Sequence, residues 1–207
     1  AGQVEKAATY IGRAVQTANG KSAVALFQWG RLAFRKGDIA NGTSRIRQAI
    51  GLDSMAHKYR YELARVLIGV KNDANSRKVA VEELETIVRS ADGLAAAGHP
   101  VRYLPDVHRQ LARAFLDAHD YAKAARHLKL VLEKVPDDMD SKAELGRALF
   151  FLGNPQATPV LRDVLMRKPG DARAALYLGL SMLNARQTSD ALPFLQQAAN
   201  SGDKRLV

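Results

Sequence analysis

Arginine follows a small residue at four places in the chain, namely Arg31, Arg65, Arg113 and Arg147. Successive members are 34, 48 and 34 residues apart. A guanidinium group is planar and always charged, and it can bind a carboxylate or a phosphate through two parallel hydrogen bonds. If a repeated fold brings these side chains to one surface, they predict a site for an anionic partner. The alternative is that arginine is simply a good helix former, paired with a neighbouring Asp or Glu.

Residue types that perform catalysis or bind metals form no such pattern. The chain has no Cys, and its five His form no His-Glu-x-x-His motif. His119 and His127 could form a metal site with Asp120, but a metal needs three or four convergent ligands, so we favour a turn residue and a surface residue. Gly20-Lys21-Ser22 lacks the earlier glycine of a phosphate-binding loop and predicts a turn and a helix cap. The sequence thus predicts no catalytic residue, no metal, no cofactor and no enzyme activity.

Composition restricts the class of partner. The 207 residues carry a formal charge of +10, with 47% hydrophobic and 6% aromatic residues. A basic surface favours acidic partners: an acidic protein or peptide, an anionic polysaccharide or nucleic acid. Nucleic acid is the less favoured of these, because aromatic residues are few and the charge is spread along the chain. No apolar run approaches the ~20 residues that span a bilayer, so we expect no membrane insertion in this segment.

The small residues that precede the arginines belong to a longer repeat. They stand at Gly30, Ala64, Ala112 and Gly146, and Gly179 continues the series without an arginine. About twelve residues after each of them comes a second small residue, and four residues further a large apolar one: Ile46, Leu84, Leu128, Leu161 and Leu195. Spacings of three, four and seven mark one face of an α-helix. Each repeat therefore predicts two helices joined by a turn.

Eleven helices are expected from this pattern. Their predicted ranges are 3–18, 22–36, 38–51, 55–70, 75–91, 103–118, 120–134, 139–152, 155–167, 171–185 and 188–200. Asp residues in the turns are suited to cap the helix that follows, and Pro136 and Pro169 cannot continue the helix before them. The 48-residue interval holds 14 extra residues, which we place mainly in an insertion over 92–102.

The repeat resembles the tetratricopeptide repeat, a helix–turn–helix unit of 34 residues. The likeness is carried by Leu145-Gly146, Gly153-Asn154, Ala157, Leu161 and Pro169, and by the matching residues of the other repeats. It implies an all-α, right-handed superhelical solenoid of stacked helix-turn-helix repeats. We expect one array over 1–207, with a leading half-repeat at 3–18 and repeats at 23–54, 57–91, 103–136, 139–169 and 172–202. Because the chain begins in mid-repeat, we expect a fragment of a longer protein.

The resemblance also implies where a partner binds. In such arrays the first helix of each repeat lines a concave groove, and the residue after the small one faces it. The resulting groove residues are Arg31, Arg65, Arg109, Arg113, Arg147, Phe27, Tyr61 and Phe150. Arg stands where the family's carboxylate-binding arrays have Asn, so that activity is not carried over.

The function expected from these residues is a non-enzymatic scaffold that binds a protein segment in a basic concave groove. The style of the repeats resembles bacterial arrays that precede outer-membrane export barrels. The alternative is therefore a periplasmic segment of an exopolysaccharide or surface-protein export machine, recruiting a modifying enzyme or contacting the polymer. Both the bacterial periplasm and the cytoplasm remain open as compartments.

Overall fold

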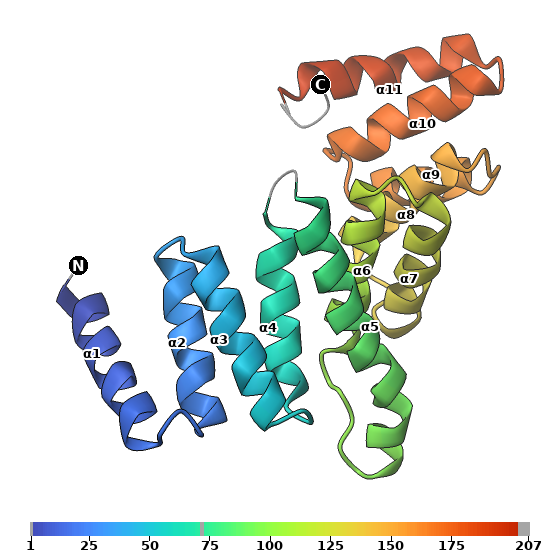
Figure 1. The fold of residues 1–207 in the computed structure, drawn as a ribbon. Coiled ribbons are helices and arrows are strands. Elements are labelled where there is room, and N and C mark those ends of the chain that lie inside the picture. Colours follow the sequence, from blue (N-terminus) through green and yellow to red (C-terminus); the bar gives the residue numbers. More distant parts are fainter. Residues whose placement is uncertain (1, 71–72, 203–207) are drawn as a thin grey trace. The chain divides into compact units, whose positions relative to one another are not determined.

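The described part of the computed structural model, residues 2–70 and 73–202, contains eleven helices and no strand (Figure 1). The chain divides into two compact units, Ala1–Val101 and Arg102–Val207. The first unit holds α1 Gly2–Thr17, α2 Ala23–Arg35, α3 Ile39–Leu52, α4 His57–Ile68 and α5 Ala74–Ala96. The second holds α6 Leu104–Asp117, α7 Tyr121–Lys134, α8 Met139–Phe151, α9 Ala157–Arg167, α10 Ala172–Asn184 and α11 Thr188–Asn200.

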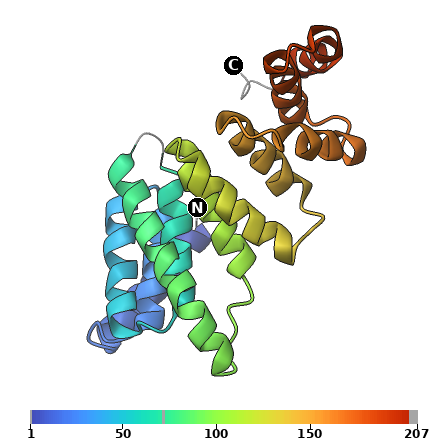
Figure 2. The ribbon, with the colours of Figure 1, turned by 90° about the vertical axis from the view of Figure 1, so that its right-hand side faces the viewer.

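Consecutive helices within each unit pack against one another as helical hairpins. In the first unit α2 pairs with α3 and α4 with α5, and α1 lies against α2 (Figure 2). In the second unit the pairs are α6 with α7, α8 with α9 and α10 with α11. The predicted all-helical repeat fold is confirmed. One continuous array over 1–207, and its right-handed twist, stay predictions.

Small residues bring the paired helices together. Gly30, Ala64, Ala112, Gly146 and Gly179 are all buried. Four of the five large residues predicted to face them are almost completely buried: Ile46, Leu84, Leu128 and Leu161. The small residues allow close approach, and the large ones fill the space between the helices. The core therefore has the register that the sequence repeat predicts.

Side chains in the turns begin the helices as expected. Asp38, Asp73, Asp120, Asp138 and Asp171 each accept a hydrogen bond from a backbone N–H in the first turn of the next helix. Such a cap satisfies one of the N–H groups that have no partner within the helix.

Removing one of these caps has a predictable cost. The carboxylate of Asp120 accepts from the backbone N–H of Lys123 at 3.2 Å. We expect Asp120→Ala to lower the free energy of unfolding by about 1 kcal/mol, because the N–H loses its partner. Asp120→Asn keeps an acceptor oxygen and serves as the control. Urea unfolding followed by circular dichroism measures both, and equal stabilities of the two variants would contradict the capping role.

One helix is longer than predicted. α5 ends at Ala96 instead of at residue 91, so the first five residues of the 92–102 insertion continue a helix. Asp92 and Gly93 are compatible with this extension because both are exposed and Gly93 has open space around it. The chain then turns at Gly98, whose φ of +81° is a conformation that favours glycine.

Candidate binding groove

The second unit contains a groove with a volume of about 980 Å³. It is lined by residues of α6, α8 and α10, the first helices of three successive hairpins, and of the turn before α10. Its charged lining comprises Arg109, Arg113, Arg147, Lys168 and Arg173 with Asp117, Asp140, Glu144 and Asp171. Leu116, Ala143 and Tyr177 add apolar surface. Five basic and four acidic groups make this a groove of mixed charge.

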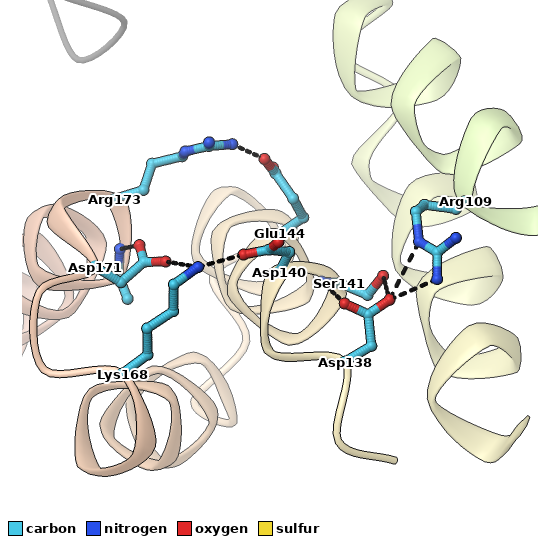
Figure 3. Close-up of polar contacts among 9 residues, drawn as sticks. Arg109, Asp138, Asp140, Ser141, Glu144, Lys168, Asp171 and Arg173 are labelled. Carbon is cyan, nitrogen blue, oxygen red and sulfur yellow. Dashed lines mark hydrogen bonds and ion pairs between the residues drawn. The ribbon is translucent and has the colours of Figure 1, made fainter. Parts of the chain in front are cut away.

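Asp138 connects Arg109, which lines the groove, to the start of α8 (Figure 3). Its carboxylate accepts hydrogen bonds from Nη2 of Arg109 at 2.7 Å and from Nε at 3.1 Å. It also accepts from the backbone N–H of Ser141 at 3.1 Å and from the Ser141 hydroxyl at 2.7 Å. Burial raises the pKa of Asp138, but the hydrogen bonds from Ser141 and Arg109 outweigh it and leave the pKa below its ordinary value. Arg109 also pairs with Asp106, so its charge is fully compensated.

Three further groove cations, Arg147, Lys168 and Arg173, also pair with acidic side chains, and Figure 3 shows the pairs of Lys168 and Arg173. Glu144 pairs with Arg147 at 3.3 Å and also with Arg173. Lys168 contacts Asp140 at 2.5 Å and Asp171 at 3.5 Å. These pairs join α8 to the start of α10 and fix the long side chains in place.

Arg113 differs from these neighbours. It is exposed and lines the groove, and within the described residues no acidic group pairs with it. The sequence explains the difference, because Arg65 and Arg147 each pair with a Glu three residues earlier, whereas Gln110 stands three residues before Arg113. A neutral amide cannot compensate the charge, so the guanidinium of Arg113 stays available.

The predicted site residues of the first unit also lie near one another. Arg31 and Arg65 both contact Glu62, at 3.4 and 3.0 Å. The guanidinium of Arg31 lies over the ring of Phe27, 5.7 Å from its centre, and Phe27 packs on the buried Tyr59. Tyr61 is half-buried on α4. Arg31 and Arg65 thus lie near each other in the first unit, and Arg113 and Arg147 line the same groove in the second. A single row of all four arginines stays a prediction.

Sequence reasoning named Phe150 but missed the rings around it. Tyr177 lies 5.5 Å from Phe150 between ring centres, and Tyr121 lies 4.4 Å from Phe151. A signal for Tyr177 was present, because it precedes a Leu-Gly pair as Glu144 does, and Glu144 lines the groove. The repeat register therefore identifies a further groove position, two residues before the small residue, beside the arginine position and the positions one turn before and after it.

A half-buried histidine pair was also missed. Nδ1 of His108 on α6 lies 3.0 Å from Nδ1 of His127 on α7. His119 instead contacts the Tyr121 hydroxyl at 2.9 Å, so the possible metal site of His119, His127 and Asp120 does not form. Across residues 2–70 and 73–202 no group of three His, Asp or Glu side chains is placed to hold a metal ion. Burial, then His108, then Arg126 lower the pKa of His127 to about 4.

The comparisons with known proteins agree with this architecture. Residues 109–157, which run from within α6 through α7 and α8 to the first residue of α9, match the model of the tetratricopeptide repeat. These residues therefore carry the tetratricopeptide repeat, and the chain as a whole has the fold of tetratricopeptide-repeat proteins. No curated protein matches the sequence.

Solved tetratricopeptide-repeat structures share its fold at low sequence identity. YrrB, described as a TPR protein with an unusual peptide-binding site, is 18% identical with a TM-score of 0.76, covering 97% of this chain and 96% of its own. A MamA structure is 16% identical with a TM-score of 0.72, covering 90% and 95%. A second, MamA MSR-1, is 18% identical with a TM-score of 0.69, covering 89% and 98%.

Stacked repeats of this family form extended surfaces that bind other molecules, so the fold is that of a protein-interaction scaffold. In the described ranges no helix combines the length and apolarity needed to cross a membrane.

Proposed function

We propose that this tetratricopeptide-repeat protein is a non-enzymatic scaffold that binds an acidic protein segment in the groove of its second unit. The observation that carries the proposal is Arg113, a groove cation that pairs with no acidic group in residues 2–70 and 73–202, whereas the neighbouring cations are paired. The peptide-binding site named for YrrB, a protein of the same fold, supports the proposal.

Physical chemistry favours a carboxylate at this position. A carboxylate that binds Arg147 or Lys168 must displace an acid already bound there, which cancels most of the gain. A carboxylate that binds Arg113 displaces no acidic group of the described residues, and a hydrogen bond to a charged group contributes about 1.5–3 kcal/mol. The ring of Tyr177, which lines the same groove and is half-buried, adds apolar contact area for the rest of the segment. Binding therefore depends on one guanidinium more than on a row of four.

Reversing the charge at Arg113 tests the proposal. Peptides are selected on the full chain from a library of random twelve-residue peptides, and their dissociation constants are measured by fluorescence anisotropy. We expect Asp and Glu to be enriched, and Arg113→Glu to raise the dissociation constants at least tenfold, as the loss of about 1.4 kcal/mol requires.

The matched control is Arg162→Glu, which makes the same change at an exposed site of α9 outside the groove lining. We expect it to change the dissociation constants by less than twofold. Equal affinities of Arg113→Glu and the unchanged chain for the selected peptides would contradict the proposal.

A salt titration separates this function from binding of nucleic acid or of an anionic polysaccharide, the ligand expected of an export segment. Binding to a polyanion releases counterions and weakens steeply, with log K for single-stranded DNA falling by about 0.7 per neutralised phosphate for each tenfold rise in salt. A peptide held by one guanidinium and apolar contacts loses much less affinity. A steep salt dependence with single-stranded DNA or heparin as the probe would support the alternatives.

A further inference from the structure

Four aromatic rings form a cluster beside the groove. Tyr121 of α7, Phe150 and Phe151 of α8, and Tyr177 of α10 are here called the aromatic rim. Phe151 stacks on Tyr121 with ring centres 4.4 Å apart and an interplanar angle of 11°. Its ring also contacts Phe150 at 5.3 Å and Tyr177 at 5.6 Å between ring centres. Phe151 is nevertheless 45% exposed, and the adjacent Leu152 is 46% exposed.

The aromatic rim is continuous with the groove. Tyr177 belongs to both, since it also lines the groove, and the guanidinium of Arg147 lies 5.9 Å from the centre of its ring. Arg147 is fixed by Glu144 at 3.3 Å. A segment lying in the groove across α6, α8 and α10 therefore reaches the rings without leaving the surface.

The rim is fixed before any partner arrives. A single exposed apolar residue on a surface needs no explanation. Phe151 differs because three neighbouring rings hold it, so that a ligand would not have to immobilise it. Preorganised aromatic surface gains affinity because the cost of ordering it is absent from the binding free energy. Stacked or edge-to-face contacts then favour an aromatic ligand group over an aliphatic one.

We propose that the aromatic rim binds an aromatic side chain of the same acidic segment, which is thereby held at two points, a carboxylate on Arg113 and a ring on Phe151. This inference rests on the proposed function. Neighbouring helices lie about 10 Å apart and Phe151 lies about 6 Å along α8 from the position equivalent to Arg113. An extended chain advances about 3.3 Å per residue, so the two ligand groups are expected about three to five residues apart.

The test uses the same random twelve-residue library on the full chain, with sequencing of the enriched peptides. On the unchanged chain we expect Phe, Tyr or Trp three to five residues from an Asp or Glu to be enriched at least tenfold over the input library. On Phe151→Ala the aromatic enrichment should disappear while the acidic enrichment persists. Leu192→Ala, which removes an exposed side chain of α11 outside the rim, is the matched control and should keep both.

The two proposals fail in different ways. If Phe151→Ala keeps the aromatic enrichment, or if none is found on the unchanged chain, the rim is not the second contact while the function stands. If Arg113→Glu keeps the acidic enrichment, the proposed function itself is wrong. Leu152→Glu places a charge at the exposed end of α8 without removing a ring, so it tests the same surface should Phe151→Ala fold poorly. Self-association in sedimentation that Phe151→Ala abolishes would also overturn the inference, since the rim would then bind a second copy.

Discussion

Replacing His127 with glutamine is expected to flatten the loss of stability that acid causes in the second unit. His127 has its pKa lowered to about 4, by burial first and then by His108 and Arg126. In an unfolded chain its pKa is about 6.5. The unfolded state therefore takes up a proton at a higher pH than the folded state. The stability that neutral His127 provides is fully present above pH 6.5 and is lost as the pH falls toward 4.

The size of the effect follows from the same two values. A shift of one pKa unit corresponds to 1.36 kcal/mol, so His127 accounts for a loss of about 3 kcal/mol between pH 6.5 and pH 4. The pair with His108 explains why the loss is large. One shared proton satisfies two Nδ1 atoms that lie 3.0 Å apart, whereas protonation of both rings places two N–H donors and two charges face to face. Glu133 opposes this effect at His108 but does not reverse it.

Urea unfolding at pH 7 and at pH 4.5 measures the difference. A glutamine side chain at this position would still offer an amide to His108 but cannot gain a proton, so His127→Gln should lose about 2 kcal/mol less than the unchanged chain over this interval. Asp138 contributes its own acid sensitivity only below about pH 3.8, where its lowered pKa acts. His99→Gln, at an exposed position, is the control and should follow the unchanged chain. Parallel losses in all three proteins would rule out the histidine pair as the cause.

Gly30→Ala is expected to lower the free energy of unfolding by about 1–3 kcal/mol, the usual cost of overpacking a core. A Cβ at Gly30 would lie 2.5 Å from Cγ1 of Ile46 and 2.9 Å from the backbone oxygen of Gly42. A side chain can rotate away, but a backbone oxygen moves only with its helix. The α2–α3 pair therefore has to separate, although alanine is accepted at the equivalent Ala64 and Ala112.

Gly51→Ala, in the same hairpin, is expected to raise the free energy of unfolding instead of lowering it. Gly51 lies in α3 with open space around it, so alanine there removes only the conformational freedom of glycine in the unfolded chain. We expect a gain of about 0.5–1 kcal/mol. Urea unfolding of both variants measures the difference. If Gly30→Ala were as stable as Gly51→Ala, the close approach of α2 and α3 would not limit the residue at position 30.

Most of the fold follows from the repeat itself. A small residue opposite a large one, as in Gly146 and Leu161, must be buried because only that pair fills the space between two helices. The Asp caps follow from local chemistry for the same reason. The extension of α5 does not follow, since Asp92 and Gly93 resemble a turn and, being exposed, carry no core pattern that would indicate a helix.

The site was less predictable than the fold. The position of each arginine follows from the register, but its availability depends on what other residues reach. The charge of Arg147 is compensated by Glu144, three residues earlier in the sequence. The charge of Arg31 is compensated by Glu62, which belongs to the next hairpin. The first pairing can be read from the sequence by comparing Glu144 with Gln110. The second is a contact between helices, and only a structure shows it.

Substitutions at Asp138 and at Arg113 are expected to have different effects on the protein. One carboxylate begins α8 and also holds Arg109, so a change at position 138 alters both the folding of a helix and the charge at one end of the groove. Arg113 supports nothing else among the described side chains. A substitution at Arg113 is therefore expected to change which partners the groove binds while leaving the stability of the fold nearly unchanged.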